Sequence, residues 1–312
     1  MIKNISVLGA GTMGHGIALA FSRFGYSVKL YDNNISYLNE VPSIIRSEAE
    51  QMVRGGLIGD ADVDNAMANI ELAPTLEGAA EGADFIIEVV PEILELKQEI
   101  FKTLDPLCGE ETIFASNTSS LRLKDVIQPL SEKRKARSII CHWFNPPHII
   151  PLVELSNYGN MPEDIFKEVY ELFLSIEKKP IKINQDVAGL VSNRLQNALA
   201  REAFYLMEEG VADAEDINDA ITYGGTAFRM SVAGLTEIVD MGGIDIWTSV
   251  AGNLWGDLED RADANQFLLD MVKAGKLGLK TGEGFSVYPE DRRAEIKEDF
   301  NDRLIRHLRD IV

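Results

Sequence analysis

Residues 5–14 read ISVLGAGTMG, an apolar run followed at once by three glycines in the spacing G-x-G-x-x-G. The apolar residues from Ile17 to Phe24 recur with a helical period, so the stretch predicts a strand, a tight turn and a helix. Gly9 permits the turn, Gly11 lets the backbone approach a pyrophosphate, and Gly14 allows the helix to pack closely on the strand. The stretch therefore predicts the first β-α-β unit of a doubly wound, Rossmann-type sheet that binds a dinucleotide.

The identity of the dinucleotide is indicated by Asp32, which follows the next predicted strand, Ser27 to Tyr31. A carboxylate at this position can accept hydrogen bonds from both ribose hydroxyls and would repel the extra phosphate of NADP, so we expect NAD. Two other interpretations stay open. The glycine turn could belong to a protein that has lost its cofactor, or to one that uses a flavin.

Short apolar runs alternate with helical patterns over roughly the first 185 residues, which is typical of β-α-β units and a parallel sheet. Between Asp32 and Asn69 the chain is too long for a simple loop, and its helical pattern, including Ser36 to Met52, predicts a helical insertion after the second strand. The expected strands are Ile5 to Leu8, Ser27 to Tyr31, Asn69 to Leu72, Phe85 to Val89, Thr112 to Ala115, Ser138 to Trp143, Leu152 to Leu155 and Pro180 to Ile183.

From about Val187 onward the strand patterns stop and amphipathic helical patterns take over. The expected helices are Leu190 to Glu209, Ala214 to Ile221, Thr236 to Leu254 and Asn265 to Ala274. The sequence thus predicts an α/β domain over residues 1–185 that binds NAD, followed by an all-α C-terminal domain over residues 186–312.

The charge balance excludes several classes of partner. The 312 residues include 30 Lys and Arg against 50 Asp and Glu, a formal net charge of -20. Such a chain repels nucleic-acid phosphates and anionic lipids, so we expect neither nucleic acid nor membrane as a partner. The sequence has no secretory pattern, no apolar run of ~18 residues, and too few cysteines for a disulfide framework. We therefore expect a cytoplasmic protein with no bound metal.

His142 lies near the end of the predicted strand Ser138 to Trp143, just before Pro146 and Pro147. Strand ends are where α/β proteins bind ligands. Glu154 follows inside the apolar run Leu152 to Leu155, and an isolated carboxylate there needs a partner such as histidine. We expect Glu154 to orient His142, whose other nitrogen exchanges a proton as general base and acid. The spacing fits equally well a solvated glutamate on an edge strand and a histidine packed in the core.

Two further polar segments lie at positions where ligands bind. Ser116 to Ser120 follows the strand that ends near Ala115, and Asn193 lies near the start of the predicted interdomain helix. On their own, these residues are also compatible with a plain polar loop and a solvated helix end.

Taken jointly, the motifs resemble the 3-hydroxyacyl-CoA dehydrogenase family over nearly the whole chain. The resemblance is carried by the glycine-rich loop, Glu88 to Glu92 with Lys97, Asn117 to Ser120, His142 to Pro147, Leu152 to Glu154, Gly189 to Leu195 and Lys276 to Phe285.

The resemblance implies specific roles for individual residues. It implies a catalytic His142 oriented by Glu154, with Ser119 and Asn193 contacting the reacting oxygen or the nearby substrate. It also implies a helical second domain that forms a homodimer and closes over the substrate. The implied cofactor contacts are the loop residues Gly9, Gly11, Thr12, Met13 and Gly14, then Asp32 and Glu92, with Lys97 and Asn117 nearer the nicotinamide, and Asn145 in support.

Two departures from the acyl-CoA enzymes bear on the substrate. The usual Pro-Met-Gly-Pro segment is replaced by Gly224 to Met230, and the helical insertion is acidic where theirs tends to be basic. The chain looks closer to relatives that act on free hydroxy acids, such as gulonate 3-dehydrogenase, carnitine dehydrogenase and a pyridine-carboxylate dehydrogenase of vitamin B6 breakdown. We expect Arg229 to bind a substrate carboxylate, because a guanidinium matches a carboxylate bidentately.

We therefore expect an NAD-dependent dehydrogenase that transfers a hydride reversibly between NAD and the secondary alcohol of a small 3-hydroxy acid. Several alternatives to this function remain. One is a 3-hydroxyacyl-CoA substrate, and another leaves Arg229 on a solvated loop or paired with Glu237 or Asp240. A different enzyme class, the 6-phosphogluconate and 3-hydroxyisobutyrate dehydrogenases, uses a lysine four residues before its interdomain asparagine, where this chain has Gly189. A non-catalytic, crystallin-like role is the remaining possibility.

Overall fold

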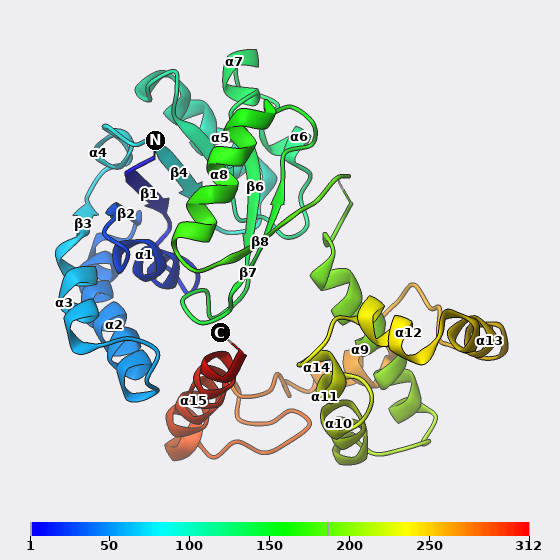
Figure 1. The fold of residues 1–312 in the computed structure, drawn as a ribbon. Helices are drawn as coiled ribbons and strands as arrows, with labels where there is room; N and C mark the ends of the chain where they lie inside the picture. Colours follow the sequence, from blue (N-terminus) through cyan, green and yellow to red (C-terminus); the bar gives the residue numbers. More distant parts are fainter. Residues whose placement is uncertain (1, 186, 312) are drawn as a thin grey trace. The chain divides into compact units, whose positions relative to one another are not determined.

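The computed structural model describes residues 2–185 and 187–311 of the chain. Contacts within the chain divide it into two compact units, each considered by itself (Figure 1). The first unit runs to Val191 and also includes Phe300–Asp310, whereas the second comprises Ser192–Asp299. The residue at the expected domain boundary, Asp186, lies outside the described residues.

The first unit is built on one eight-stranded sheet with the order β3-β2-β1-β4-β5-β6-β7-β8. All eight predicted strands are confirmed to within one residue at either end. Their bounds are β1 Asn4–Leu8, β2 Ser27–Tyr31, β3 Ile70–Ala73, β4 Phe85–Glu88, β5 Ile113–Ser116, β6 Ser138–Trp143, β7 Leu152–Ser156 and β8 Lys179–Lys182.

The sheet is parallel, as expected, except at one pair of strands. β7 pairs antiparallel with β6, whereas every other neighbouring pair is parallel. The reason is the connection between them, residues 144–151, which contains no helix. A parallel crossover needs a dozen or more residues, whereas a short connection returns the chain in the opposite direction.

Helices cover both faces of the sheet. One buried cluster joins one face to α1, α2, α3 and α8, and a second cluster joins the other face to α4, α5 and α6. The predicted insertion after β2 is confirmed as α2 and α3. The helices of this unit, before the chain returns through α15, are α1 Gly14–Ser22, α2 Ile35–Arg54, α3 Asp60–Ala68, α4 Leu76–Ala80, α5 Leu94–Leu104, η1 Asp105–Leu107, α6 Leu123–Val126, α7 Glu132–Lys135 and α8 Glu163–Ser175.

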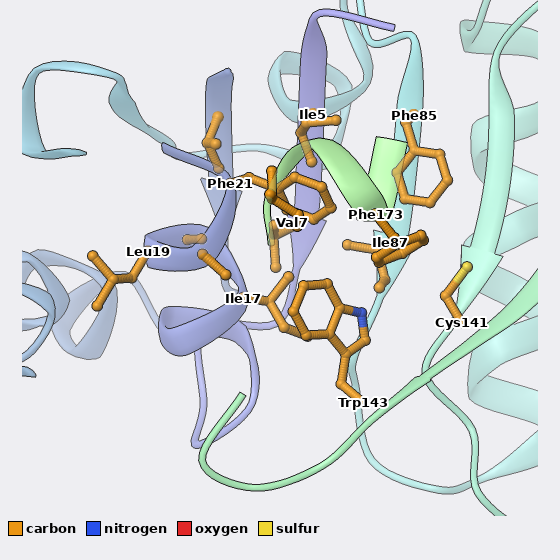
Figure 2. Packing of buried hydrophobic residues seen from close by; sticks show 14 of the residues in the cluster. Ile5, Val7, Ile17, Leu19, Phe21, Phe85, Ile87, Cys141, Trp143 and Phe173 are labelled. Atoms are coloured by element: carbon orange, nitrogen blue, oxygen red, sulfur yellow. The ribbon is translucent and has the colours of Figure 1, made fainter. Parts of the chain in front are cut away.

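Aromatic packing fixes the strand that carries the predicted site. Trp143, the last residue of β6, is 2% exposed and packs edge to face against Phe21 and Phe173 (Figure 2). Because neighbouring residues of a strand point to opposite faces, anchoring Trp143 in this cluster directs His142 to the other face. The core therefore sets the orientation of the histidine.

The second unit is helical, as predicted, apart from isolated bridges near Glu283. The pattern expected as one helix over Thr236 to Leu254 is two helices, because Gly243 breaks it with a φ of +92°. The helices are α9 Ser192–Glu208, α10 Ala214–Tyr223, α11 Ala227–Met230, α12 Leu235–Gly242, α13 Ile244–Leu254, α14 Gln266–Lys273, η2 Glu290–Arg292 and α15 Arg293–Ile311.

The last helix, α15, returns to the first unit. Ile305 is fully buried in the core cluster that includes α2, and its side chain lies where a Cβ on Gly55 would be. Asp302 accepts a hydrogen bond of 2.8 Å from the Gln51 side chain. None of the helices expected from the sequence covered this segment, although Ile296, Phe300, Leu304 and Leu308 recur with the helical period.

Replacing Ile305 with Ala is expected to lower the free energy of unfolding of the first unit by ~2–5 kcal/mol, the usual cost of truncating a buried isoleucine. Urea denaturation followed by circular dichroism measures it. The control is His307→Ala, an exposed position on the same helix. Equal effects of the two substitutions would show that α15 does not contribute to this core.

Candidate active site

The carboxyl ends of β1, β4, β5 and β6 lie along one edge of the sheet. Between β1 and β4 the strand order reverses, because the chain first runs outward through β2 and β3 and then returns to pair β4 with β1. Such a switch point leaves a crevice in which doubly wound proteins bind ligands. The predicted site residues of the first unit gather along this edge.

The glycine-rich loop after β1 contains two glycines that the chain itself requires. Gly9 has a φ of +104°, and a Cβ there would lie 3.1 Å from the carbonyl oxygen of Val89. A Cβ on Gly14 would overlap the carbonyl oxygen of Gly9. Gly11 differs, since a Cβ there would meet no atom within 4 Å. Its lack of a side chain is explained by a ligand that approaches the backbone.

Asp32 lies beside this loop at the end of β2. Its Oδ2 accepts a hydrogen bond of 2.9 Å from the amide of Ala10, and its Oδ1 one of 2.9 Å from Asn34. Each carboxylate oxygen keeps a lone pair for a further donor. A cavity of about 540 Å³ opens here, lined by Gly11 and Asp32 and by apolar side chains that include Leu96 and Ile100. An acid at the mouth of an apolar slot fits the adenosine half of NAD.

His142 and Glu154 face each other across β6 and β7, paired directly in the antiparallel register. His142 Nδ1 lies 2.8 Å from Glu154 Oε2, and the two residues are 5% and 0% exposed. The other carboxylate oxygen accepts a 2.9 Å hydrogen bond from the amide of Val191. β7 is an interior strand, so the interpretation of Glu154 as a solvated edge residue is wrong.

The second imidazole nitrogen of His142 is left for a ligand. Among residues 2–185 and 187–311, no hydrogen bond is made by Nε2. The ring is held by Glu154 on one side and by the edge of Phe144, with ring centroids 4.6 Å apart. The proton on Nδ1 is assigned from the contact with Glu154, which makes Nε2 the acceptor in the neutral ring.

A second buried carboxylate, Glu88, ends β4. Its Oε1 lies 2.7 Å from Lys97 Nζ and accepts a 2.7 Å bond from the amide of Val90, and its Oε2 accepts a 2.8 Å bond from the Ser116 hydroxyl. Glu88 and Lys97 are 0% and 1% exposed. Glu88 was not predicted as a site residue in its own right, although it shows the same pattern as Glu154, an isolated carboxylate in an apolar strand.

Glu92 holds the polar loop that follows β5. Its Oε1 accepts hydrogen bonds from the Thr118 hydroxyl at 2.5 Å, from the amides of Ser119 and Ser120 at 3.1 and 3.0 Å, and from the Ser120 hydroxyl at 2.8 Å. Burial alone would raise the pKa of Glu92, but these hydrogen bonds and nearby Lys97 lower it to about 2. Glu92 is therefore ionised at neutral pH, and its carboxylate holds the backbone of Ser119 in position.

Asn117 connects the ends of three strands. Its amide donates to the carbonyl of Glu88 at 2.9 Å, and its Oδ1 accepts from the amide of Trp143 at 2.8 Å. Within the described chain its side-chain NH₂ group makes no hydrogen bond, which leaves two donors at the sheet edge. Asn145 is exposed on the loop after β6, beside the cis peptide bond to Pro146.

Lys97 is buried and lies against three acceptors. Its ammonium lies 2.7 Å from Glu88, 3.2 Å from the carbonyl of Val90 and 3.2 Å from Glu92. Three acceptors match the three donors of an ammonium, so a direct contact with the cofactor would require one of these bonds to break. Lys97 therefore connects the carboxylates of Glu88 and Glu92.

The remaining predicted residues, Asn193 and Arg229, belong to the second unit. Asn193 lies in the first turn of α9, and its carbonyl accepts a hydrogen bond from the Asn197 side chain. Arg229 lies on the short helix α11 rather than in a turn. It is exposed, and its Nε donates to the carbonyl of Gly225 at 3.2 Å.

No cluster of three His, Cys, Asp or Glu side chains in the described part of the chain is arranged to hold a metal ion. Among the helices described above, none combines the length and apolar character that crossing a membrane requires.

Comparison with known proteins assigns both halves of the chain to one family. The model of the NAD binding domain of 3-hydroxyacyl-CoA dehydrogenase matches residues 4–187, and that of its C-terminal domain matches residues 189–288. A 5-formyl-3-hydroxy-2-methylpyridine 4-carboxylate 5-dehydrogenase of Mesorhizobium japonicum is 35% identical over 94% of each chain. A probable 3-hydroxybutyryl-CoA dehydrogenase of Bacillus subtilis is 34% identical, over 93% of this chain and 98% of that one.

The fold agrees with a crystal structure as well. A 5-formyl-3-hydroxy-2-methylpyridine 4-carboxylic acid 5-dehydrogenase, described as an NAD⁺-dependent dismutase, superposes with a TM-score of 0.91. Its sequence is 32% identical, and the match covers 100% of this chain and 99% of that one.

Replacing Glu92 with Gln is expected to lower the melting temperature at neutral pH, because the loop loses a charged acceptor. The folded-state pKa of about 2 lies below the ~4.3 of an unfolded glutamate, so the stabilisation is complete above pH ~4.3 and is lost as the pH falls toward 2. The difference in melting temperature from wild type should shrink over that interval.

Circular dichroism melts across the pH range measure this difference. Glu95→Gln, an exposed position on α5, serves as control and should show little difference at any pH. A Glu92→Gln difference that stays constant down to the lowest pH would contradict the assignment.

Proposed function

The chain belongs to the 3-hydroxyacyl-CoA dehydrogenase family and is an NAD-dependent dehydrogenase; on this premise we propose that it interconverts the secondary alcohol of a small 3-hydroxy acid and the corresponding ketone. The observation that carries the proposal is the buried contact of His142 with Glu154, which leaves Nε2 of the ring available. We assign His142 as general base and acid and Glu154 as its orienting partner.

In the direction of oxidation, His142 Nε2 accepts the hydroxyl proton of the substrate. Glu154 keeps the other proton on Nδ1 and stabilises the imidazolium that forms, since its negative charge lies 2.8 Å away. NAD, when bound, supplies the hydride acceptor. In the reverse direction the imidazolium returns its proton to the forming alcohol.

The residues proposed to hold NAD lie along the same sheet edge. Gly9, Gly11, Thr12, Met13 and Gly14 would form the pyrophosphate loop, where the N-terminus of α1 provides backbone donors. Asp32 would bind the ribose hydroxyls and disfavour the phosphate of NADP. Nearer the reacting carbon we propose contacts from Asn117 and Asn145, whereas Glu92 and Lys97 act by positioning the Ser119 loop. Ser119 and Asn193 are the proposed contacts to the substrate oxygen.

Arg229 supports a free carboxylate substrate. In the part of the chain that the structure describes, its guanidinium meets no carboxylate, including those of Glu237 and Asp240, and its one hydrogen bond is to the carbonyl of Gly225. The similarity to a dehydrogenase named for a pyridine carboxylate supports the same class of substrate. A 3-hydroxyacyl-CoA thioester is the second candidate, favoured by the similarity to the Bacillus subtilis protein.

We also propose that the second unit forms a homodimer. Of the described residues between Ser192 and Asp299, only two apolar side chains are buried, those of Ile217 and Ile238. Large apolar side chains such as Trp255 and Met241 are 72% and 75% exposed. A helical unit that buries so little of its apolar surface needs a cover, and a second copy of the chain supplies one.

Replacing His142 with Gln is expected to lower kcat by at least ~10²-fold, at the lower end of general acid-base contributions, while NADH affinity stays near wild type. NADH absorbance and fluorescence titration measure the two. His307→Gln is the control, since His307 is exposed on α15. Because Glu154 acts through His142, adding Glu154→Gln to His142→Gln should cost little more. Near-normal turnover of His142→Gln would show that His142 is a packed core residue and not the general base.

Replacing Arg229 with Met is expected to cost ~2–5 kcal/mol in kcat/KM for a free 3-hydroxy acid, as when one member of a desolvated charge pair is removed. Wild type and variant are compared on gulonate, carnitine, 3-hydroxybutyrate and 3-hydroxybutyryl-CoA. Arg292→Met is the control, because Arg292 is exposed and donates its hydrogen bonds to its neighbour Glu295 on the same helical segment. Wild-type activity on the thioester alone, unchanged in the variant, would overturn the free-acid proposal.

Light scattering at low micromolar concentration is expected to give a mass of twice the 34.5 kDa of one chain. Dissociation on dilution should expose the apolar surface of the helical unit and increase binding of a hydrophobic dye. A mass of one chain at that concentration would rule out the proposed homodimer.

A further inference from the structure

A second cavity of the first unit lies apart from the dinucleotide crevice. It has a volume of about 270 Å³ and is bounded by the ends of α1 and α2, the loop between β6 and β7, the residues just before β8, and α15. None of the active-site residues named above lines it. We refer to it as the Lys178 cavity.

The Lys178 cavity carries positive charge in a chain whose net charge is -20. Its charged lining residues are Arg23, Lys178 and Arg309 against Glu177. Glu177 is already paired with Arg23 at 2.9 Å, which leaves Arg309 and the protonated form of Lys178 as the excess cations. The weak approach of Arg309 to Asp310, 3.6 Å on the protein surface, does little to offset this charge.

Lys178 is 5% exposed and held in place. Its ammonium donates to the carbonyls of Pro147 at 2.7 Å and Ile150 at 2.8 Å. In the described chain these are its only hydrogen bonds, so one of three donors has no acceptor, although the ammonium also lies 5.3 Å from the centroid of the Trp143 ring. Burial, with a further contribution from Arg23, lowers the pKa of Lys178 to about 7. An anion in the cavity would relieve the repulsion between these cations.

His148 is a second buried polar residue of the cavity lining, and its ring nitrogens form no hydrogen bond within the described chain. It is 5% exposed, and both nitrogens are buried. Glu48 Oε2 lies 3.7 Å from Nδ1, beyond hydrogen-bond distance, and is held by His15 at 2.9 Å. Burial chiefly lowers the pKa of His148 to about 4, so the neutral ring has one N–H to donate.

The position of His148 is fixed by packing. A Cβ on Gly16 of α1 would lie 2.7 Å from Pro147 Cγ and 2.9 Å from His148 Nδ1. The absence of a side chain at Gly16 therefore allows the histidine to lie close against the helix. A buried N–H without an acceptor costs ~1–3 kcal/mol, so a ligand that supplied an acceptor would be stabilised here.

The rest of the lining shows which anion fits. Apolar side chains including Leu57, Ile149, Ile176 and Leu308 form most of the remaining wall. Inorganic phosphate would leave these side chains uncovered, whereas an organic acid covers them with its carbon skeleton. A carboxylate also matches the planar guanidinium of Arg309.

We propose that the Lys178 cavity binds a small organic carboxylate, which accepts hydrogen bonds from Lys178, His148 and Arg309 and packs its apolar part against Leu57, Ile149 and Leu308. This site is separate from the proposed substrate site and does not depend on the proposed reaction.

The test uses the full chain with its histidine rings labelled with ¹³C, because the chain has only four histidines. His148 reports on the Lys178 cavity and His142 on the active site, and single substitutions assign the signals. The probes are benzoate, its neutral analogue benzamide, and inorganic phosphate, each added to protein saturated with NADH.

Benzoate is expected to shift the His148 signal saturably while the His142 signal stays in place, and benzamide should bind much more weakly. Arg309→Gln should weaken benzoate binding at least about tenfold, since a hydrogen bond to a charged group is lost. Arg306→Gln, an exposed position on the same helix, should bind benzoate like wild type. An unchanged His142 signal in both variants shows that they fold.

Four outcomes would overturn the proposal. These are no saturable shift of His148, equal binding of benzoate and benzamide, a response to phosphate but not to benzoate, and equal binding by wild type and Arg309→Gln. A benzoate shift confined to His142 would place the acid in the active site instead. Failure here leaves the proposed dehydrogenase activity untouched, because that activity is measured through His142 and NADH.

Discussion

The carboxylate of Glu154 lies on an interior strand with no exposure to water, and a buried charge of this kind persists only where donors surround it. Its two oxygens are met by the ring of His142 and by the amide of Val191. Both contacts depend on the antiparallel register of β6 and β7, because a slip of one residue would turn Glu154 to the opposite face. The packing of Trp143 fixes that register from the other side of the sheet.

A second buried carboxylate, that of Glu88 at the end of β4, must also be surrounded by donors. Glu88 is satisfied by Lys97, Ser116 and a backbone amide, and through Lys97 it connects to Glu92 and the loop after β5. One buried carboxylate thus orients His142, the group proposed to exchange a proton, whereas the other supports the loop after β5. A site that must hold its geometry without a ligand benefits from such pre-organised support.

The strands could be predicted from sequence because each is a short apolar run between breakers, and the glycine spacing of residues 9–14 identified the edge where the site lies. The antiparallel direction of β7 follows from the short connection before it, which holds no helix. The alternation of apolar and helical patterns along the chain, taken alone, predicts a parallel strand. The place of Lys97 could not be predicted, because a lysine in a helical pattern gives no sign of burial. The catalytic and binding roles of all the predicted site residues stay predictions, and for Asn193 and Arg229 the second unit adds no contact comparable to that between His142 and Glu154.

The chain leaves the first unit after Val191 and comes back to it in α15, where Ile305 enters the core. In topological terms the helical unit is an insertion near the end of a discontinuous domain. During synthesis on the ribosome, the α/β domain therefore stays incomplete until α15 has left the exit tunnel. The helical unit, whose residues 192–299 are contiguous, is free to form before the domain that precedes it is finished.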